Sequence, residues 1–214
     1  IAAREQAASR GSAPLVMVGF NRRFAPHIVR IKELLSSVSL PKAVIMTVNA
    51  GAVPSEHWTQ DLDEGGGRIV GEACHYIDLL RHLVGCQITA SKIDFLGAEN
   101  GGCDSAAITL RFEDGSLGTI HYLANGNRGF PKERLEVFAA GRILLLDNFR
   151  TLKAFGWPGF SALKLWRQDK GQRACAREFV ASVAHGYDSP IPFCELVEVA
   201  EITIGLAEAC RKNA

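Results

Sequence analysis

The sequence lacks the features that mark membrane-spanning, secreted and nucleic-acid-binding proteins. No apolar run approaches the roughly 20 residues that a membrane-spanning helix needs. Lysine and arginine number 24 against 23 aspartates and glutamates, and a net charge of +1 creates no field that favours nucleic acid or an anionic membrane. The sequence neither starts with methionine nor has the basic-then-apolar layout of a signal peptide, so we expect a piece of a longer cytoplasmic protein.

Cysteine pairs with metal-binding or redox spacing are also missing. The six cysteines include no C-x-x-C pair, and a chain of 214 residues can build a core without disulfides. We therefore expect reduced thiols, as in a cytoplasmic protein.

The first half of the chain alternates between helical and extended patterns. Hydrophobic residues make up 47% and charged residues 22%, which is typical of a globular protein. We expect a helix over 1–10 and a buried strand over 13–20, a pair typical of the end of an α/β domain. An amphipathic helix over 25–38 and a strand over 41–51 follow, and a polar loop leads to a helix over 71–84.

The second half has mostly the period-two pattern of strands. Turn signals such as Glu113-Asp-Gly-Ser separate consecutive strands, which predicts antiparallel neighbours. The expected strands are 87–96, 105–113, 116–124, 134–141, 142–148 and 151–157, and helices over 171–186 and 193–212 end the chain. Grouped strands with helices at the ends predict an α+β fold, a large, mostly antiparallel β-sheet with helices on one face. The other face also has apolar positions, which suggests a second subunit there.

The stretch GGGRIVGEACHYIDLLRHLVG, residues 65–85, contains several polar residues of chemical interest. Its glycines come close to a dinucleotide-binding fingerprint, but the preceding SEHWTQDLDE is polar and not a strand, which argues against a phosphate site. A metal site would use Glu72, Cys74, His75 and His57. Since Cys74 and His75 are adjacent and point about 100° apart on a helix, we predict no metal.

Glu72 and His75 share a helix face and form a candidate acid/base pair. The amino end of a helix would keep Glu72 ionised and orient it toward His75. Histidine so placed can accept a proton from a hydroxyl near neutral pH. On spacing alone, a half-buried packing histidine remains the alternative.

Three stretches of the sequence together resemble one protein family. LVMVGFNRRFAP at 15–26, the glycine-rich helix at 65–85 and FEDGSLGTIHY at 112–122 are similar to segments of the glucose-fructose oxidoreductase, inositol dehydrogenase and MocA (Gfo/Idh/MocA) family. The resemblance implies that 1–20 end an N-terminal Rossmann domain and that 21–214 form the C-terminal α/β domain, which binds substrate and often dimerises. It also implies an NAD(P)-dependent oxidoreductase acting on a sugar, cyclitol or similar polyol.

The resemblance further implies that NAD or NADP is bound mainly by a domain outside this chain. The family's G-x-G-x-x-G and Glu-Lys-Pro motifs belong to that N-terminal domain, and neither occurs in this sequence. The chain alone is therefore expected to be inactive, and the full protein is expected to be a homodimer or a larger homo-oligomer through the sheet.

Candidate catalytic residues follow from the same resemblance. His75 falls at the family's catalytic histidine, which removes a hydroxyl proton while hydride leaves for the nicotinamide. The family's partner aspartate, four residues earlier, is replaced by Gly71, and Glu72 is the expected substitute.

The cleft between cofactor and substrate is expected to include four more residues. Asn21 and Arg22 lie at the domain junction, where Arg22 could contact either substrate or cofactor. Asn49 ends a strand near the pocket, and Trp58 could stack on a sugar ring. A surface salt bridge for Arg22 and a packing role for Trp58 are equally compatible with the sequence.

Two other functions fit the same scaffold. A non-catalytic ligand-sensing or assembly domain would explain why Gly71 replaces the aspartate. A glycoside hydrolase that uses NAD transiently is a further possibility. The substrate itself does not follow from the sequence.

Overall fold

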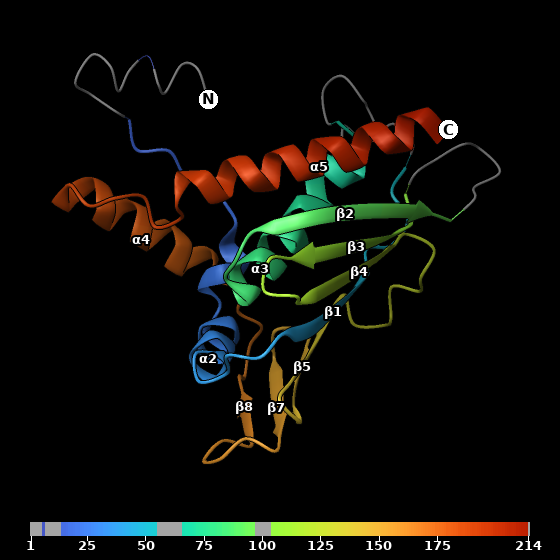
Figure 1. Cartoon of the computed structure of the whole chain (residues 1–214). Helices are drawn as coiled ribbons and strands as arrows, with labels where there is room; N and C mark the ends of the chain where they lie inside the picture. The colour runs from blue at the N-terminus through green and yellow to red at the C-terminus, as the bar shows by residue number, and fades with distance from the viewer. Residues whose placement is uncertain (1–5, 7–13, 55–65, 97–103, 214) are drawn as a thin grey trace.

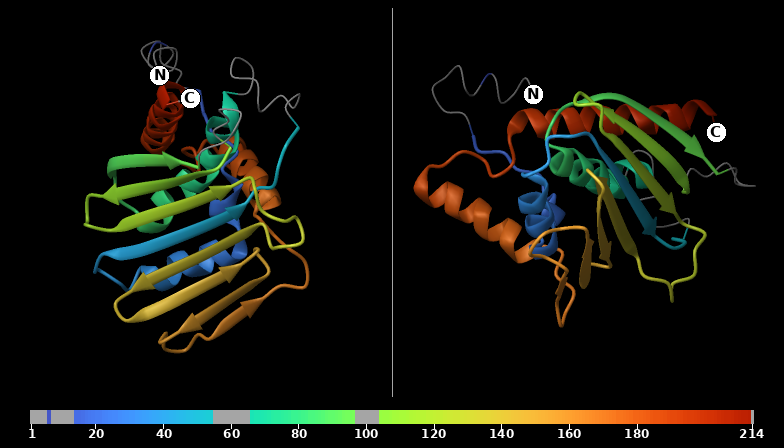
Figure 2. Two further views of the ribbon diagram at one scale, coloured as in Figure 1. Left: turned by 90° about the vertical axis from the view of Figure 1, so that its right-hand side faces the viewer. Right: turned by 60° about the horizontal axis from the view of Figure 1, so that its bottom comes forward.

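The computed structural model describes residue 6 and residues 14–54, 66–96 and 104–213, without the side chains of 210–213. An eight-stranded sheet with the order β2-β3-β4-β1-β5-β6-β7-β8 forms its centre (Figure 2, left). The strands are β1 (Lys42–Asn49), β2 (Ile88–Phe95), β3 (Ala106–Phe112), β4 (Leu117–Leu123), β5 (Glu133–Ala139), β6 (Arg142–Asp147), β7 (Thr151–Phe155) and β8 (Ala162–Lys164). Every neighbouring pair is antiparallel except β1 and β4, which confirms the predicted α+β class.

The position of β1 in the middle of the sheet was not predicted. β1 pairs in parallel with β4 and antiparallel with β5, so it joins the two halves of the sheet. Val44, Met46 and Val48 point to the core, whereas Ile45 and Thr47 lie half-exposed on the other face. The three-residue strand β8 was also missed.

Helices cover one face of the sheet and leave the other bare, as expected (Figures 1 and 2). They are the 3₁₀ turn η1 (Asn21–Phe24), α2 (Pro26–Leu35), the π-helical segment η3 (Ile69–Ala73), α3 (Cys74–Val84), α4 (Gln172–His185) and α5 (Phe193–Asn213). Nearly all of α3 is buried because it packs against both the sheet and α5. Within the described residues, we find no helix with the length and apolarity to cross a membrane.

Two of the predicted elements differ in the structure. The strand predicted for 13–20 is wrong for its described part, since 14–20 have no regular secondary structure. A strand buried on both faces needs neighbouring strands, and no described strand pairs with these residues. The helix predicted for 71–84 begins at Gly67 instead and runs without a break to Val84. His75 therefore lies well inside a continuous helix and not at its free amino end.

A buried ion cluster joins η1, α3 and α5. The Arg23 guanidinium donates to both carboxylate oxygens of Asp78 at 2.6–2.9 Å and to Glu195 at 2.5 Å. On α3, Arg81 donates to Glu198 at 2.9 Å. Burial raises the pKa of Asp78 to about 6, although the bonds from Arg23 act in the opposite direction. The cluster fixes the chain around η1.

Gly171 allows α4 to begin directly against η1. Its φ is +83°, and a Cβ at this position would lie 2.4 Å from the carbonyl oxygen of Asn21 and 2.5 Å from the amide nitrogen of Ala25. Only glycine combines this conformation with so close a backbone approach. The close approach fixes η1, which contains Asn21 and Arg22.

Candidate functional site

His75 lies immediately after a π-helical turn. The amide of Cys74 donates to the carbonyl of Ile69, five residues earlier, so η3 has one residue more per turn than the α-helix that follows. Such π-bulges inside α-helices are frequent at functional sites. The position of His75 in the helix is therefore set by an irregularity that the glycine-rich sequence did not predict.

The imidazole of His75 is half-buried and uncharged at neutral pH. Its Nδ1 atom is buried and has no hydrogen-bond partner among the described residues, and the ring meets Phe20 edge-on with centroids 5.5 Å apart. Burial and then the charge of Arg22 lower the pKa of His75 to about 4, against the opposing effect of Glu133 and Glu72. A buried polar atom without a partner is costly, and such atoms commonly mark a position where another group binds.

Glu72 is not hydrogen-bonded to His75. Both Nε and an Nη of Arg68 donate to one oxygen of Glu72, at 3.3 and 3.1 Å, and the Lys132 ammonium lies 3.7 Å from the other. Arg68 itself is buried and also donates to the carbonyl of Gly51. Glu72 therefore acts on His75 through its charge and not as the contact that orients it.

Arg22 forms a buried ion pair instead of the predicted surface salt bridge or free ligand group. Its guanidinium donates to both oxygens of Glu133 at 2.8 and 3.0 Å and to the Tyr76 hydroxyl at 3.2 Å. Lys170 donates to the same carboxylate at 2.6 Å. Burial alone would raise the pKa of Glu133, but the bonds and charges of Arg22 and Lys170 together outweigh it, so the pKa is lowered and the carboxylate is ionised.

The side chains of the other predicted site residues that the structure describes donate hydrogen bonds to backbone carbonyls. The Asn21 amide donates to the carbonyl of Lys170 at 2.7 Å, which ties η1 to the segment before α4. The Asn49 amide donates to the carbonyls of Asn127 and Phe130 at 2.7 and 3.2 Å, which ties the end of β1 to the loop before β5. Trp58 lies outside the described residues.

Several polar residues that pair with Glu72, Arg22 or Glu133 were missed from sequence. They are Arg68, Tyr76, Lys132, Glu133 and Lys170. The alternation of β5 gave no signal for Glu133, because a charged residue at the start of a strand is normally exposed. Arg22 and Glu133 are 111 positions apart, so only the folded chain brings them together.

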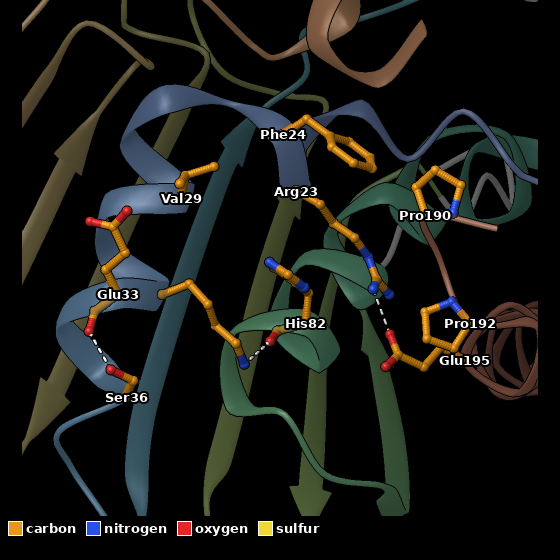
Figure 3. Close-up of a pocket in the computed structure, with 10 residues that line it drawn as sticks. Arg23, Phe24, Val29, Glu33, Ser36, His82, Pro190, Pro192 and Glu195 are labelled. Atoms are coloured by element: carbon orange, nitrogen blue, oxygen red, sulfur yellow. Dashed lines mark hydrogen bonds and ion pairs between the residues drawn. The ribbon is translucent and has the colours of Figure 1, made fainter. Parts of the chain in front are cut away.

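A separate hollow lies beside the last turns of α3, at His82. It has a volume of about 590 Å³ and lies between α2, α3 and the start of α5 (Figure 3). The charged groups at its rim have partners, since Arg23 pairs with Glu195 and Lys32 donates to the carbonyls of His82 and Leu83. We therefore place the candidate site at His75.

Comparison with known proteins identifies relatives of the chain. It is 30% identical over 152 residues to the uncharacterized oxidoreductase YrbE of Bacillus subtilis, covering 67% of this chain and 43% of that protein. It is 25% identical over 142 residues to the myo-inositol 2-dehydrogenase of Thermotoga maritima, covering 64% of this chain and 42% of that protein. The chain thus spans less than half the length of these relatives.

Solved structures and a family model agree with these relatives. A levoglucosan dehydrogenase in complex with NADH and levoglucosan superposes with a TM-score of 0.78 at 19% identity, over 97% of this chain and 67% of that one, which shows a shared fold. Residues 28–141, just over half of the chain, match the model of the GFO/IDH/MocA C-terminal domain. The chain therefore belongs to the GFO/IDH/MocA family, and it includes that family's C-terminal domain.

Proposed function

We propose that the protein to which this chain belongs is an NAD(P)-dependent oxidoreductase that acts on a hydroxyl group of a sugar, cyclitol or similar polyol. Its relatives include a myo-inositol 2-dehydrogenase and two inositol 2-dehydrogenases of Saccharopolyspora erythraea. The observation that supports the proposal best is His75, a half-buried, neutral imidazole whose buried Nδ1 has no partner within the part of the chain that the structure describes.

In this proposal His75 accepts the hydroxyl proton at one of its ring nitrogens. NAD or NADP would supply the hydride acceptor for the same carbon, and we assign its binding mainly to a domain outside this chain. Arg22 is committed to Glu133 and Tyr76, so we assign it to shaping the pocket rather than to holding the cofactor. The neutral ring is free to accept a proton at neutral pH, and its pKa of about 4 makes it a weak base unless the bound substrate or cofactor raises that pKa.

Substitution of His75 in the full-length protein tests the proposal. We expect His75→Ala to lower kcat by roughly 10² or more, the usual contribution of a general base. His185→Ala is the matched control, because His185 is exposed on α4 and its Nδ1 donates to the carbonyl of Ala181. Unchanged turnover in His75→Ala would remove the imidazole from the chemistry.

The isolated chain provides a second test. Because we assign cofactor binding to a domain beyond this chain, the 214 residues alone should neither bind NAD nor turn over substrate. Calorimetry that detected micromolar NAD binding to this chain would contradict the assignment.

We also propose that the protein is a cytoplasmic homo-oligomer that associates through the bare sheet face. Leu117, Phe138 and Phe155 are exposed, and Phe138 lies opposite Ile143 in the register of β5 and β6. The four cysteines whose side chains are described are free thiols, which suits a reducing compartment. Phe138→Asp should shift the full-length protein to smaller species in analytical ultracentrifugation, and an unchanged mass would exclude this face.

A ligand-sensing or assembly role is the second candidate. Gly71 stands where the family has an aspartate, and Glu72 is bound to Arg68 instead of replacing it. This role predicts that the full-length protein binds a polyol with no NAD(P)-linked turnover. Enzyme assays beside calorimetry on the same preparation separate the two functions.

A further inference from the structure

Two ion clusters flank His75, and each contains more positive than negative groups. One consists of Glu133 with Arg22 and Lys170, the other of Glu72 with Arg68 and Lys132. The carboxylates of both clusters act electrostatically on the His75 ring. Both clusters therefore belong to the surroundings of one imidazole.

In the first cluster Arg22 alone pairs with both carboxylate oxygens of Glu133. The guanidinium contacts both carboxylate oxygens, and the carboxylate is completely buried. Lys170 approaches one of the same oxygens at 2.6 Å and keeps 17% of its side chain exposed. Since an ammonium has three donors, Lys170 retains donors for another acceptor. The cluster has a charge of +1.

The second cluster repeats the arrangement. Arg68, with 1% of its side chain exposed, neutralises Glu72 through two N–H groups on one oxygen. The Lys132 ammonium lies 3.7 Å from the other oxygen, too far for a hydrogen bond, and donates none among the described residues. Its side chain is 43% exposed, so this cluster also presents an accessible positive charge.

Lys132 and Glu133 are neighbours in sequence at the start of β5, so this short segment contributes a residue to each cluster. His75 is neutral and compensates neither excess charge. The charge of +1 for each cluster counts only residues that the structure describes, and the charged residues of 55–65 are not included.

We infer that the substrate oxidised at His75 is an anionic polyol, whose carboxylate or phosphate is bound by Lys132 and Lys170. This inference rests on the function proposed above and specifies its substrate class. Among the described residues, a neutral polyol would leave one excess positive charge in each cluster beside the half-buried ring of His75, and charge–charge attraction is stronger where water is partly excluded. An anionic group gains charge-assisted hydrogen bonds from both lysines, and a carboxylate and a phosphate are equally suited to two ammonium donors.

The test compares matched substrates with the full-length protein. NAD- and NADP-linked oxidation is measured for glucose, glucuronate and glucose 6-phosphate, and for myo-inositol and its monophosphate. We expect kcat/KM to be at least about ten-fold higher for an anionic member than for its neutral counterpart, because a hydrogen bond to a charged group contributes this much or more. Whether glucuronate or the phosphates benefit distinguishes the two kinds of anion. The preference should also weaken as salt is raised.

Lysine substitutions connect this preference to the structure. Lys132→Gln and Lys170→Gln should each raise KM for the preferred anion about ten-fold more than they raise KM for the neutral counterpart. Lys92→Gln is the matched control, because Lys92 lies on β2 with 74% of its side chain exposed and pairs only with Asp94. Circular dichroism checks that each variant is folded.

The outcomes separate this inference from the proposed function. If wild-type protein oxidises neutral polyols as well as or better than their anionic counterparts, the inference is overturned and the proposed function stands. Unchanged anion KM in both lysine variants overturns it in the same way. If no member is oxidised, and calorimetry detects no binding of glucuronate or glucose 6-phosphate to the protein with NAD, both fail together. A preference that both lysines control supports the inference.

Discussion

The low pKa of His75 makes a prediction about stability that needs no substrate or cofactor. A pKa of about 4 in the folded chain, against 6.5 for an ordinary histidine, means that folding favours the neutral ring. Because the unfolded chain binds the proton more tightly, His75 contributes stability above pH 6.5, and this contribution is lost as the pH falls toward 4.

The size of the effect follows from the two pKa values. Between pH 7.5 and pH 5, proton binding by an unfolded histidine with pKa 6.5 and a folded one with pKa 4 lowers the free energy of unfolding by about 2 kcal/mol. His75→Gln removes this titration, whereas all other groups, including His82 with its pKa lowered to about 3, titrate in both proteins. The stability of the variant should therefore fall about 2 kcal/mol less than that of the wild type over this range.

Urea unfolding of the 214-residue chain, followed by circular dichroism at several pH values, measures the difference. His185→Gln, a change at an exposed histidine of α4, is the matched control for the substitution itself. If the wild-type and His75→Gln curves are parallel between pH 5 and 7.5, folding does not keep the His75 ring neutral. The neutral state that the proposed function assigns to His75 would then lose its physical basis.

Two further predictions concern the packing around η1. Arg23→Met should lower the free energy of unfolding by about 3–5 kcal/mol, because it leaves the buried Asp78 carboxylate without its partner. The double variant Arg23→Met with Asp78→Leu should recover much of this loss in urea unfolding, and no recovery would contradict the explanation. Gly171→Ala should lower the melting temperature far more than Gly159→Ala, since both glycines have a φ above +70° but only a Cβ at Gly171 would collide with backbone atoms. Equal shifts would show that φ alone matters.

Most of the elements could be predicted because their signals are local. The change of apolar period after residue 86 and the turn residues between strands place β2 to β7 correctly. The order of the strands in the sheet could not be predicted from these local signals. The parallel pairing of β1 with β4 joins residues more than 70 positions apart, and short turns say nothing about it. The strand predicted for 13–20 failed for a related reason, because an apolar run forms a strand only beside a partner.

The candidate site was predictable only in part. The sequence placed His75 on a helix beside an acidic residue, and both features hold. The sequence could not show which basic residue pairs with each carboxylate. Glu72 pairs with Arg68 one turn away, and Glu133 pairs with Arg22 across 111 residues. The sequence consequently suggested an acid/base pair, where the structure has a neutral histidine between two ion clusters.

Gly71 gives this difference a direct test. The family resemblance expects an aspartate at this position, four residues before His75, where helical side chains are neighbours. Glu72 is held by Arg68 and forms no hydrogen bond with His75, and burial with the Arg22 charge keeps the pKa of His75 near 4. Gly71→Asp should supply that carboxylate, raise the His75 pKa toward 6.5, and so reduce the pH-dependent loss of stability between pH 7.5 and 5. Gly71→Asn, without the charge, is the matched control. If Gly71→Asp and Gly71→Asn have the same pH dependence, the charge of a neighbouring carboxylate does not control His75, and the missing aspartate cannot explain why this imidazole is so weak a base.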